Sequence, residues 1–372
     1  MSVSENTPPE TYIDSSEALI KFCERLGSDF SHTECAVDTE ADSMHSYETK
    51  LCLIQFAVPG ELAIIDPLSP EIESLDPFLN YLKEMDTVWM HGADYDMSMF
   101  RMTFDWVPKQ VWDTQTAARL LGIQKYGLAS LLESEFDVKL SKQSQKADWS
   151  KRPLSPKMLA YAYNDVRYLL ELGNRYLDRV REKGRYDWFV ESCDSARASV
   201  MVRDEKPSDL QWRINGWGKL DRKGLVYLKA LWYWRDEECR KLDRPAFKFL
   251  GNQELLDMAA KMERGEKVTP PHYIRPPFAR RMLKALSEAE TVPEEEYPVK
   301  YRRNKGQRLD IDESRFKAIR NYRDKIAEEL GIDQTLLGTR VVLERLASQN
   351  LEEKERCDLL MDWQREVLAP VL

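Results

Sequence analysis

Two carboxylates placed two residues apart are the first groups in this sequence that could do chemistry. Asp38 and Glu40 lie in the short β-like run CAVDTE at 35–40. Successive side chains of a strand point to opposite faces, so both carboxylates lie on one face of the predicted sheet. Adjacent carboxylates repel each other, and a hard divalent cation with oxygen ligands relieves that repulsion. An exposed strand end with two solvated acids remains the alternative.

A third acid follows a buried strand at the point where a helix begins. The segment HGADYD runs from His91 to Asp96, directly after the apolar residues of TVWMH at 87–91. Asp94 is expected to cap the helix and Asp96 to lie in its first turn, which the helix dipole favours without any function. The functional interpretation is that Asp96 points into a cleft at the edge of the sheet.

A tyrosine and a fourth acid share one face of a predicted helix. Tyr161 and Asp165 are four residues apart within the apolar stretch LAYAYNDVRYLL. An acid in such a stretch is costly to bury without a partner. The structural alternative is an ion pair from Asp165 to Arg167 or to Arg152.

These four acids and one tyrosine come from three separate elements. If the four carboxylates converge on one point, they need two divalent ions to neutralise them. Two such ions can clamp the attacking and leaving oxygens of an in-line phosphoryl displacement. A tyrosine hydroxyl beside them can orient the attacking water or accept its proton.

The first half of the chain must supply the elements that hold these residues. Strand patterns at 35–40, 51–58 and 62–66 predict a three-strand antiparallel meander, and 87–91 predicts a further buried strand. Helical patterns are predicted at 71–85, from Asp94, at 113–121, at 127–136 and at 155–183. This order indicates an α/β domain with a mixed sheet flanked by helices.

Beyond about residue 185 the sequence reads as helix, with linkers expected near 200–215 and 290–308. Residues 228–259 and 316–347 are weakly alike: each opens with an apolar-basic helix that contains an aromatic-Arg-Asp pattern. This similarity indicates an internal duplication.

Composition limits the partners and the compartment. The chain has 372 residues and a formal charge of −9, which excludes a binder that works by bulk positive charge. Local basic patches at 264–284 and 300–308 could contact phosphates, or could be charged linkers. The six cysteines form no CxxC pair, the N-terminus is unlike a signal peptide, and no apolar run approaches the roughly 20 residues of a bilayer span. A cytoplasmic protein without a membrane segment is expected.

Several ordered motifs resemble one known family. DTEADS…KLCLIQFA (38–57), HGADYDMSMF (91–100) and YAYNDVRYLL (161–170) resemble the three exonuclease motifs of the DEDD superfamily, and the tyrosine matches its DEDDy branch. WDTQTAARLLG, YGLASLL and DWSKRPLS lie between them. The ordered set is similar to ribonuclease D, the two helical repeats resemble its paired HRDC domains, and MDWQREVLAPVL (361–372) resembles its C-terminus.

The resemblance implies an architecture and a reaction. It implies a ribonuclease H-like exonuclease domain at 1–200, followed by all-α HRDC-like domains at 213–290 and 308–372. Two magnesium or manganese ions and a tyrosine that positions the attacking water would hydrolyse RNA from its 3′ end. Nucleoside 5′-monophosphates would be released, with tRNA precursors as the family's usual substrate. The residues that would hold the ions are Asp38, Glu40, Asp96 and Asp165, and the tyrosine is Tyr161.

Other expectations concern the substrate and the departures from the family. The extra acid Asp94 and the pair Ala41-Asp42 depart from its pattern, and Asp113 could orient either the substrate or the fold. No stable protein partner is implied. The predicted nucleic-acid contacts are Thr39, His91, Lys151, Arg152, Arg302 and Arg303. Two alternatives remain: the same chemistry on DNA, and a non-catalytic nucleic-acid or protein scaffold on the same fold.

Overall fold

A computed structural model describes residues 8–28, 32–140, 144–202, 207–300 and 309–372. The chain divides into two compact units, each built from separated stretches. The first contains Met1–Ala41, Leu51–Arg203 and Gly306–Leu372, and the second contains Asp42–Lys50 and Asp204–Lys305. The predicted Arg302 and Arg303 contacts lie outside the described residues.

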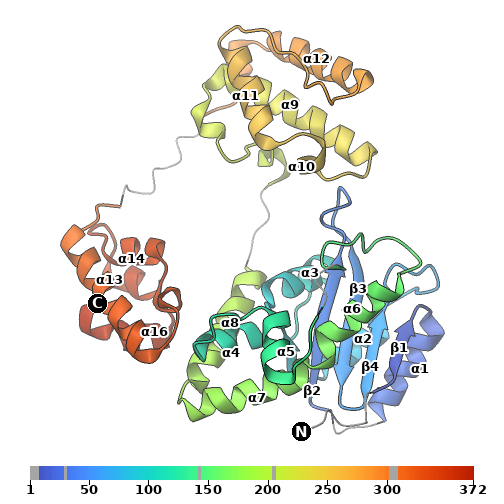
Figure 1. The fold of residues 1–372 in the computed structure, drawn as a ribbon. Helices are drawn as coiled ribbons and strands as arrows, with labels where there is room; N and C mark the ends of the chain where they lie inside the picture. The colour runs from blue at the N-terminus through green and yellow to red at the C-terminus, as the bar shows by residue number, and fades with distance from the viewer. Residues whose placement is uncertain (1–7, 29–31, 141–143, 203–206, 301–308) are drawn as a thin grey trace. The chain divides into compact units, whose positions relative to one another are not determined.

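A six-stranded mixed sheet organises the first unit, in the order β1-β4-β3-β2-β5-β6 (Figure 1). The strands are β1 (Glu10–Ile13), β2 (Glu34–Ala41), β3 (Leu51–Val58), β4 (Glu61–Ile65), β5 (Thr87–Met90) and β6 (Val111–Asp113). β2, β3 and β4 form the predicted antiparallel meander, while β1 pairs with β4, β5 with β2 and β6 with β5 in parallel. The mixed sheet with flanking helices is therefore confirmed, and β1 and β6 are additions to it.

The two faces of the sheet are buried by different helices. One face packs against α1 (Ser16–Gly27), α2 (Asp76–Lys83) and α3 (Asp94–Phe104). The other packs against α4 (Thr114–Leu120), α5 (Leu128–Phe136), α6 (Pro156–Arg167), α7 (Leu169–Glu182) and α8 (Tyr186–Met201). In Figure 1, α6 crosses this second face over β3 and β4. Since both faces are covered, every residue of β3 is buried.

Alternation along β3 separates the two cores. Leu53 and Ala57 belong to the core beneath α6 and α7, whereas Ile54 and Phe56 belong to the core beneath α1 and α2. Gln55 lies between them in sequence and has the parity of Leu53. The α6 face of β3 therefore carries one amide among apolar side chains.

Two expected helix boundaries differ in the structure. The continuous pattern at 155–183 becomes α6 and α7, which meet at Tyr168, where ψ is 0°. Asp94 was expected to be an N-cap, and this prediction is wrong: Ala93 is the N-cap of α3, and Asp94 lies in the first turn. An acid in the first turn still interacts favourably with the helix dipole.

The second unit is helical, with α9 (Arg222–Lys241), α10 (Ala246–Phe249), α11 (Asn252–Glu263) and α12 (Pro276–Glu290). Its core includes Trp212 and Trp234. Residues 42–50, the loop between β2 and β3, belong to this unit. Within it, Tyr47 Oη donates a hydrogen bond of 2.6 Å to Asp236 on α9.

The last helices belong to the first unit rather than to the second. They are α13 (Glu313–Leu330), α14 (Arg340–Leu346), α15 (Glu353–Cys357) and α16 (Asp362–Leu368). Trp363 stacks on Trp188 of α8 with ring centroids 4.8 Å apart. The Glu191 carboxylate accepts hydrogen bonds from the backbone nitrogens of Asp362 and Trp363. The core beneath α7 and α8 therefore continues into residues from the end of the sequence.

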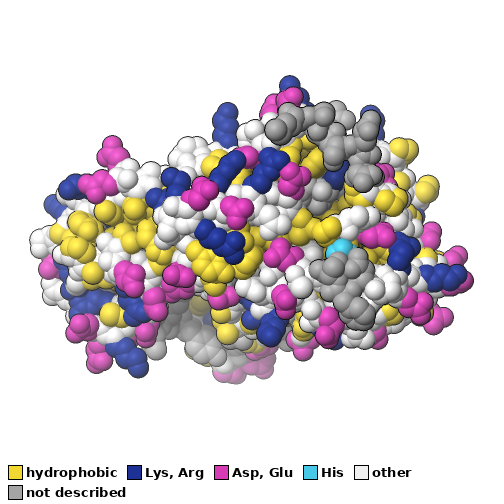
Figure 2. Space-filling view, turned by 90° about the horizontal axis from the view of Figure 1, so that it is seen from below, with side chains coloured by type: hydrophobic (Ala, Val, Ile, Leu, Met, Phe, Trp, Pro, Cys, Tyr) yellow, Lys and Arg dark blue, Asp and Glu magenta, His cyan; other side chains and the backbone are white. Residues whose placement is uncertain are grey.

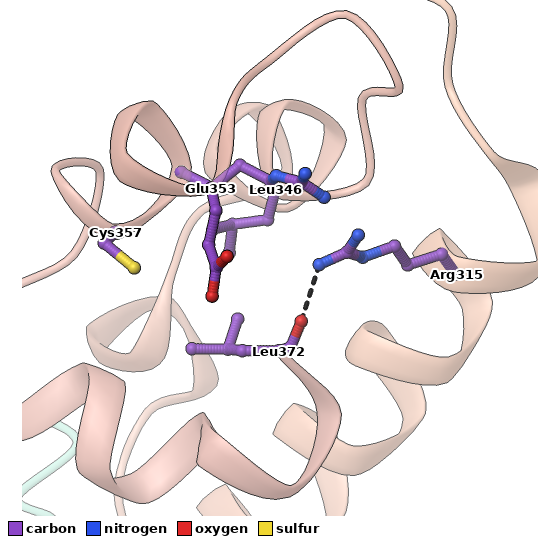
Figure 3. A pocket seen from close by; sticks show the side chains of 6 residues that line it. Arg315, Leu346, Glu353, Cys357 and Leu372 are labelled. Atoms are coloured by element: carbon purple, nitrogen blue, oxygen red, sulfur yellow. Dashed lines mark hydrogen bonds between the residues drawn. The ribbon is translucent and has the colours of Figure 1, made fainter.

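A small pocket of about 280 Å³ lies within these last helices. Figure 3 shows Arg315 donating a hydrogen bond to the Leu372 backbone oxygen at its edge, at 2.6 Å. Glu353 and Cys357 lie on the other side of the pocket. Its described lining contains none of the predicted site residues that the structure describes.

The surface carries charges of both signs. On the face in Figure 2, Lys and Arg side chains are interspersed with Asp and Glu side chains. In the 264–284 segment, Arg264 pairs with Glu266 and Arg281 with Glu238. Within the described ranges, every helix is too short or too polar to cross a bilayer.

Candidate metal centre

β2 presents the first two acids of the candidate site. Asp38 and Glu40 have the same parity in β2, opposite Gln55 and Leu53 of β3 respectively. The pairing shifts between Glu40 and Ala41, so regular pairing is interrupted directly after the second acid. Both acids therefore lie on the sheet face that α6 covers, close to the end of the strand.

α6 brings a third acid to the same place. Ser155 caps this helix, its Oγ accepting from the backbone nitrogen of Met158, and Pro156 occupies the first turn. Asp165 lies near the end of α6 and is 6% exposed. One carboxylate oxygen from each of Asp38, Glu40 and Asp165 lies within 4.8 Å of the other two. This arrangement can hold a metal ion.

Asp96 lies in the first turn of α3, and its carboxylate accepts hydrogen bonds from a residue of β2. Thr39 donates to Asp96 Oδ1 both from its backbone nitrogen, at 2.9 Å, and from its Oγ1, at 2.5 Å. Asp96 is 4% exposed. Both bonds go to the same oxygen of Asp96, and together they fix the orientation of its carboxylate.

Burial raises the pKa of all four carboxyl groups. The pKa of Asp38 lies well above its usual range, first through burial and then through repulsion from the other three acids. The pKa of Glu40 rises to about 9 through burial and through the charges of Asp165 and Asp96. Burial raises the pKa of Asp96 and of Asp165 to about 7, although hydrogen bonds from Thr39 and from Tyr161 respectively oppose the shift. A cluster with this electrostatic strain is suited to bind cations.

Tyr161 completes the group from the same face of α6 as Asp165. Its pKa is raised far above the usual range, chiefly by burial and then by the nearby carboxylates, so it stays a neutral phenol at physiological pH. Its ring lies 6.0 Å from that of the buried Trp149, centroid to centroid. A neutral phenol beside the acids can donate or accept a hydrogen bond, which suits it to orient a water.

The two arginines considered as ion-pair partners of Asp165 form ion pairs with other acids. Arg167 pairs with Glu10, and its Nε donates to Asn164 at 3.2 Å. Arg152 pairs with Asp66. Asp165 is therefore not the partner of either arginine.

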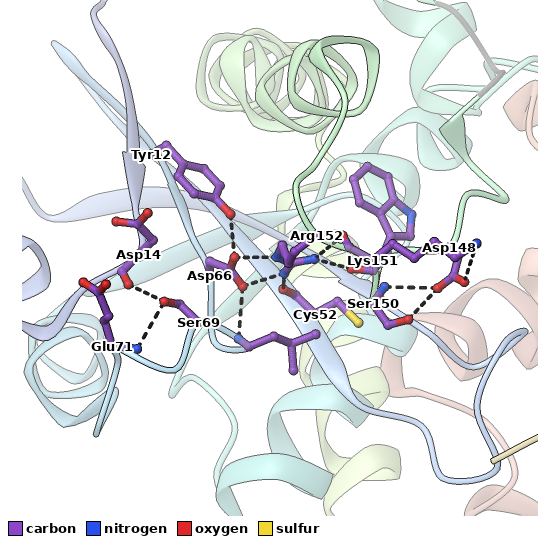
Figure 4. A network of polar contacts seen from close by, with 12 residues as sticks. Tyr12, Asp14, Cys52, Asp66, Ser69, Glu71, Asp148, Ser150, Lys151 and Arg152 are labelled. Carbon is purple, nitrogen blue, oxygen red and sulfur yellow. Dashed lines mark hydrogen bonds and ion pairs between the residues drawn. The ribbon is translucent and has the colours of Figure 1, made fainter. Parts of the chain in front are cut away.

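Arg152 fixes the loop that leads into α6 (Figure 4). Its Nε and Nη2 each donate to Asp66 at 2.5 Å, while Nη2 also reaches the Cys52 carbonyl and Nη1 the Trp149 carbonyl. Tyr12 donates a further hydrogen bond to Asp66. Burial would raise the pKa of Asp66, but the hydrogen bonds from Arg152 and Tyr12 outweigh it and lower that pKa.

The predicted nucleic-acid contacts lie in different environments. Lys151 extends from the surface, with Nζ 3.5 Å from Asp148. His91 Nδ1 lies 2.9 Å from Thr114 Oγ1, and burial lowers its pKa. Thr39 is bound to Asp96 and Arg152 to Asp66, roles that the sequence did not predict. Contacts of these residues with nucleic acid stay predictions.

Asp113 orients the fold around the candidate site. It caps α4 by accepting from the backbone nitrogen of Gln115, and it accepts from that of Gly92, both at 2.8 Å. It therefore joins the start of α4 to the turn that precedes α3.

The donor set fits a hard divalent cation. All its ligand atoms are carboxylate oxygens, and magnesium, manganese and calcium prefer such ligands. The cysteines in the described parts of the chain lie outside this cluster. The geometry is therefore that of a candidate centre for a hard divalent cation beside a tyrosine.

Known protein families match two parts of this chain. A family of 3′–5′ exonucleases matches residues 11–180, and the HRDC domain family matches residues 225–268. A ribonuclease D from Zymomonas mobilis is 31% identical over 297 residues, which cover 77% of this chain and 74% of that protein. A ribonuclease D from Xanthomonas oryzae is 29% identical over 349 residues, which cover 89% and 90% of the two chains.

A solved structure gives the same fold. The crystal structure of Escherichia coli RNase D, described as an exoribonuclease involved in structured RNA processing, matches with a TM-score of 0.71. The match covers 97% of this chain and 99% of that one, at 24% sequence identity. Taken with the sequence relatives and the matched exonuclease domain, it leads to one conclusion: this chain is a nuclease that belongs to the ribonuclease D family.

Proposed function

We propose that this protein is a 3′→5′ exoribonuclease that works by a two-metal mechanism and releases nucleoside 5′-monophosphates. The observation that carries the proposal is the convergence of Asp38, Glu40 and Asp165 within 4.8 Å, beside Asp96 and Tyr161. The RNA substrate is supported by the relatives, which are named ribonuclease D.

In this proposal the protein's side chains position charge and water. The four carboxylates would hold two divalent ions, which supply the positive charge that an in-line phosphoryl displacement needs. Tyr161 stays protonated and hydrogen-bonds to Asp165, so its hydroxyl would orient the attacking water rather than remove its proton as an anion. Thr39 would keep Asp96 turned so that one oxygen faces the ions.

The test is a cleavage assay with full-length protein. RNA labelled at its 5′ end, and DNA of the same sequence, are incubated with magnesium, with manganese or with EDTA. A ladder that shortens from the 3′ end, on RNA only and absent with EDTA, is the expected result, and chromatography should identify the product as nucleoside 5′-monophosphate. Asp38→Asn is the matched inactive control.

Other outcomes of the same assay would redirect the proposal. Equal shortening of DNA would show that the ribose 2′-OH is not required. Cleavage of RNA whose 3′ end is chemically blocked would indicate an endonuclease. Absence of product with either metal would favour a non-catalytic scaffold.

We propose that tRNA precursors with extra 3′ nucleotides are among the substrates. The support is that the E. coli neighbour is described as acting in structured RNA processing. A competition between a tRNA precursor and an unstructured RNA with the same 3′ tail tests this. Faster trimming of the precursor, with arrest near the mature end, is expected. Equal rates would contradict the assignment.

We also propose that the helices from Glu313 onward form a second HRDC-like domain, related to the first by duplication. Its support is a repeated buried contact. Arg235 Nη1 donates to the Leu250 carbonyl at 2.9 Å, and Arg323 Nη1 donates to the Gly338 carbonyl at 2.8 Å. Both arginines are buried, 4% and 6% exposed, and both carbonyls lie 15 residues further along the chain.

The repeated contact gives the duplication a test. Arg235→Met and Arg323→Met each remove the donors of one such bond and leave a buried carbonyl without its partner. Each should lower the thermal stability of the helices that contain it, and Lys229→Met, at an exposed position of α9, serves as a control. If only one of the two arginines matters, the two helical segments are not equivalent in structure.

A further inference from the structure

Gln55 is a buried polar residue whose side-chain amide has no hydrogen-bond partner among the described residues. It lies in the middle of β3 with 0% of its surface exposed. Both Nε2 and Oε1 lack a hydrogen-bond partner among the described residues. Burying an amide unpaired costs free energy that an apolar side chain of similar size would not cost. The amide therefore needs an explanation beyond packing.

The strand register places this amide next to the candidate metal centre. Gln55 pairs directly with Asp38 across β2 and β3, and Leu53 pairs in the same way with Glu40. Side chains of directly opposed residues project from the same face, with Cβ atoms roughly 5 Å apart. Gln55 is thus the cross-strand neighbour of an acid that the three-carboxylate cluster contains.

The surroundings of Gln55 offer its amide few other partners. Leu53 and Ala57, its neighbours on the same face of β3, are apolar and buried. The α6 segment that packs on β3 carries Asp165, which belongs to the cluster, and Tyr161, which hydrogen-bonds to Asp165. The strand register and the packing of α6 therefore place acids of the candidate metal centre on the sheet face that Gln55 shares.

We propose that Gln55 is a positioning residue of the metal centre, whose side-chain amide donates a hydrogen bond to the Asp38 carboxylate when cations are bound. A carboxylate that ligates a cation through one oxygen keeps lone pairs on the other, and a donor there fixes its orientation. The bond to an ionised carboxylate is also stronger than one between neutral groups. Asp38 is the ligand that the strand register places directly opposite Gln55.

This inference rests on the proposed metal-dependent function. It predicts that replacing Gln55 has different effects on the protein without cations and on the protein with cations bound. The described protein groups give the amide no hydrogen-bond partner, so replacing it with an apolar group should not destabilise the fold in EDTA. In the cation-bound protein the same replacement removes a hydrogen bond, so cation binding should weaken. A residue that only fills space would change both states alike.

The experiment compares full-length wild type, Gln55→Met and Gln55→Leu, with Leu53→Met as the matched control on the same strand and face. Calorimetric titration with Mn²⁺ measures affinity, and thermal unfolding is recorded in EDTA and in Mn²⁺. We expect both Gln55 variants to bind Mn²⁺ about 10- to 100-fold more weakly. Their unfolding temperature in EDTA should equal or exceed that of wild type. Leu53→Met should keep wild-type Mn²⁺ affinity.

The remaining outcomes separate the inference from the function on which it rests. If wild type binds Mn²⁺ and degrades RNA while Gln55→Met binds Mn²⁺ equally well, Gln55 is not a positioning residue and the proposed function stands. If Gln55→Met unfolds far below Leu53→Met in EDTA, the amide has a structural partner and the inference is wrong. If wild type binds no Mn²⁺, both the inference and the proposed metal centre fail.

Discussion

Thr39 donates two hydrogen bonds to one oxygen of Asp96, one from its backbone nitrogen and one from its Oγ1. Thr39 lies between Asp38 and Glu40, so the strand that carries two acids also sets the orientation of a third. Replacing the threonine should therefore affect cation binding although its side chain is not a ligand.

Thr39→Val keeps the shape of the side chain but removes its hydroxyl. We expect Mn²⁺ affinity to fall about 10-fold or more, because Asp96 loses one of the two bonds that fix it. Thr39→Ser keeps the hydroxyl and should retain most of the affinity. Calorimetric titration of both variants is the measurement, and equal binding by Val and Ser variants would show that the Oγ1 bond is unimportant.

Tyr161→Phe should separate catalysis from cation binding. The substitution removes the hydroxyl proposed to orient the attacking water, so the cleavage rate should fall by roughly 100-fold. Mn²⁺ affinity should change little, because the four carboxylates remain. Asp165→Asn is the contrasting variant, which should lose both activity and affinity. A Tyr161→Phe protein with full activity would remove Tyr161 from the site.

The raised carboxyl pKa values predict how stability depends on pH. The unfolded chain has ordinary carboxyl pKa values near 4, whereas those of Asp96 and Asp165 are about 7 and that of Glu40 about 9 in the folded protein. Between these limits the folded state binds more protons, so its stability should fall as pH rises.

Thermal unfolding in EDTA, recorded from about pH 5 to about pH 9, measures this dependence. Saturating Mn²⁺ should reduce the slope, because the cations take the place of the protons. Asp165→Asn should reduce the slope in EDTA as well, because one titrating group is gone. A slope that is unchanged in Asp165→Asn would mean that other groups control it.

Arg152→Lys should act through the fold rather than through contact with phosphate. A lysine cannot reproduce the two bonds to Asp66 together with those to the Cys52 and Trp149 carbonyls. We expect a loss of about 2–4 kcal/mol in unfolding free energy, as for a broken and largely buried ion pair. Urea unfolding measures it, and the exposed Lys151→Ala is the matched control. A stable Arg152→Lys that only binds RNA more weakly would favour the phosphate contact.

The parts of this protein that follow a local period could be predicted from the sequence. The strand period placed Asp38 and Glu40 on one face, and the helical spacing of four did the same for Tyr161 and Asp165. The meander was visible because its three strands are long and apolar. β1 and β6, with 4 and 3 residues, are too short to show a period.

The side-chain contacts that the sequence did not predict join residues that are distant in the sequence. Asp66 and Arg152 are 86 residues apart, and Thr39 and Asp96 are 57 apart, so only the finished fold shows that they meet. The choice of Asp96 over Asp94 came from the family motif, since both acids follow the same strand. Gln55 could be found only from the register between β2 and β3.

The packing of Trp363 on Trp188 has a consequence for how this protein is made. Chains grow on the ribosome from the N-terminus, and domains begin to fold as they emerge. The nuclease emerges first, yet Leu337 and Trp363 belong to its core beneath α7 and α8. The part of this core that Leu337 and Trp363 cover can therefore be completed only after the intervening helical unit has been translated.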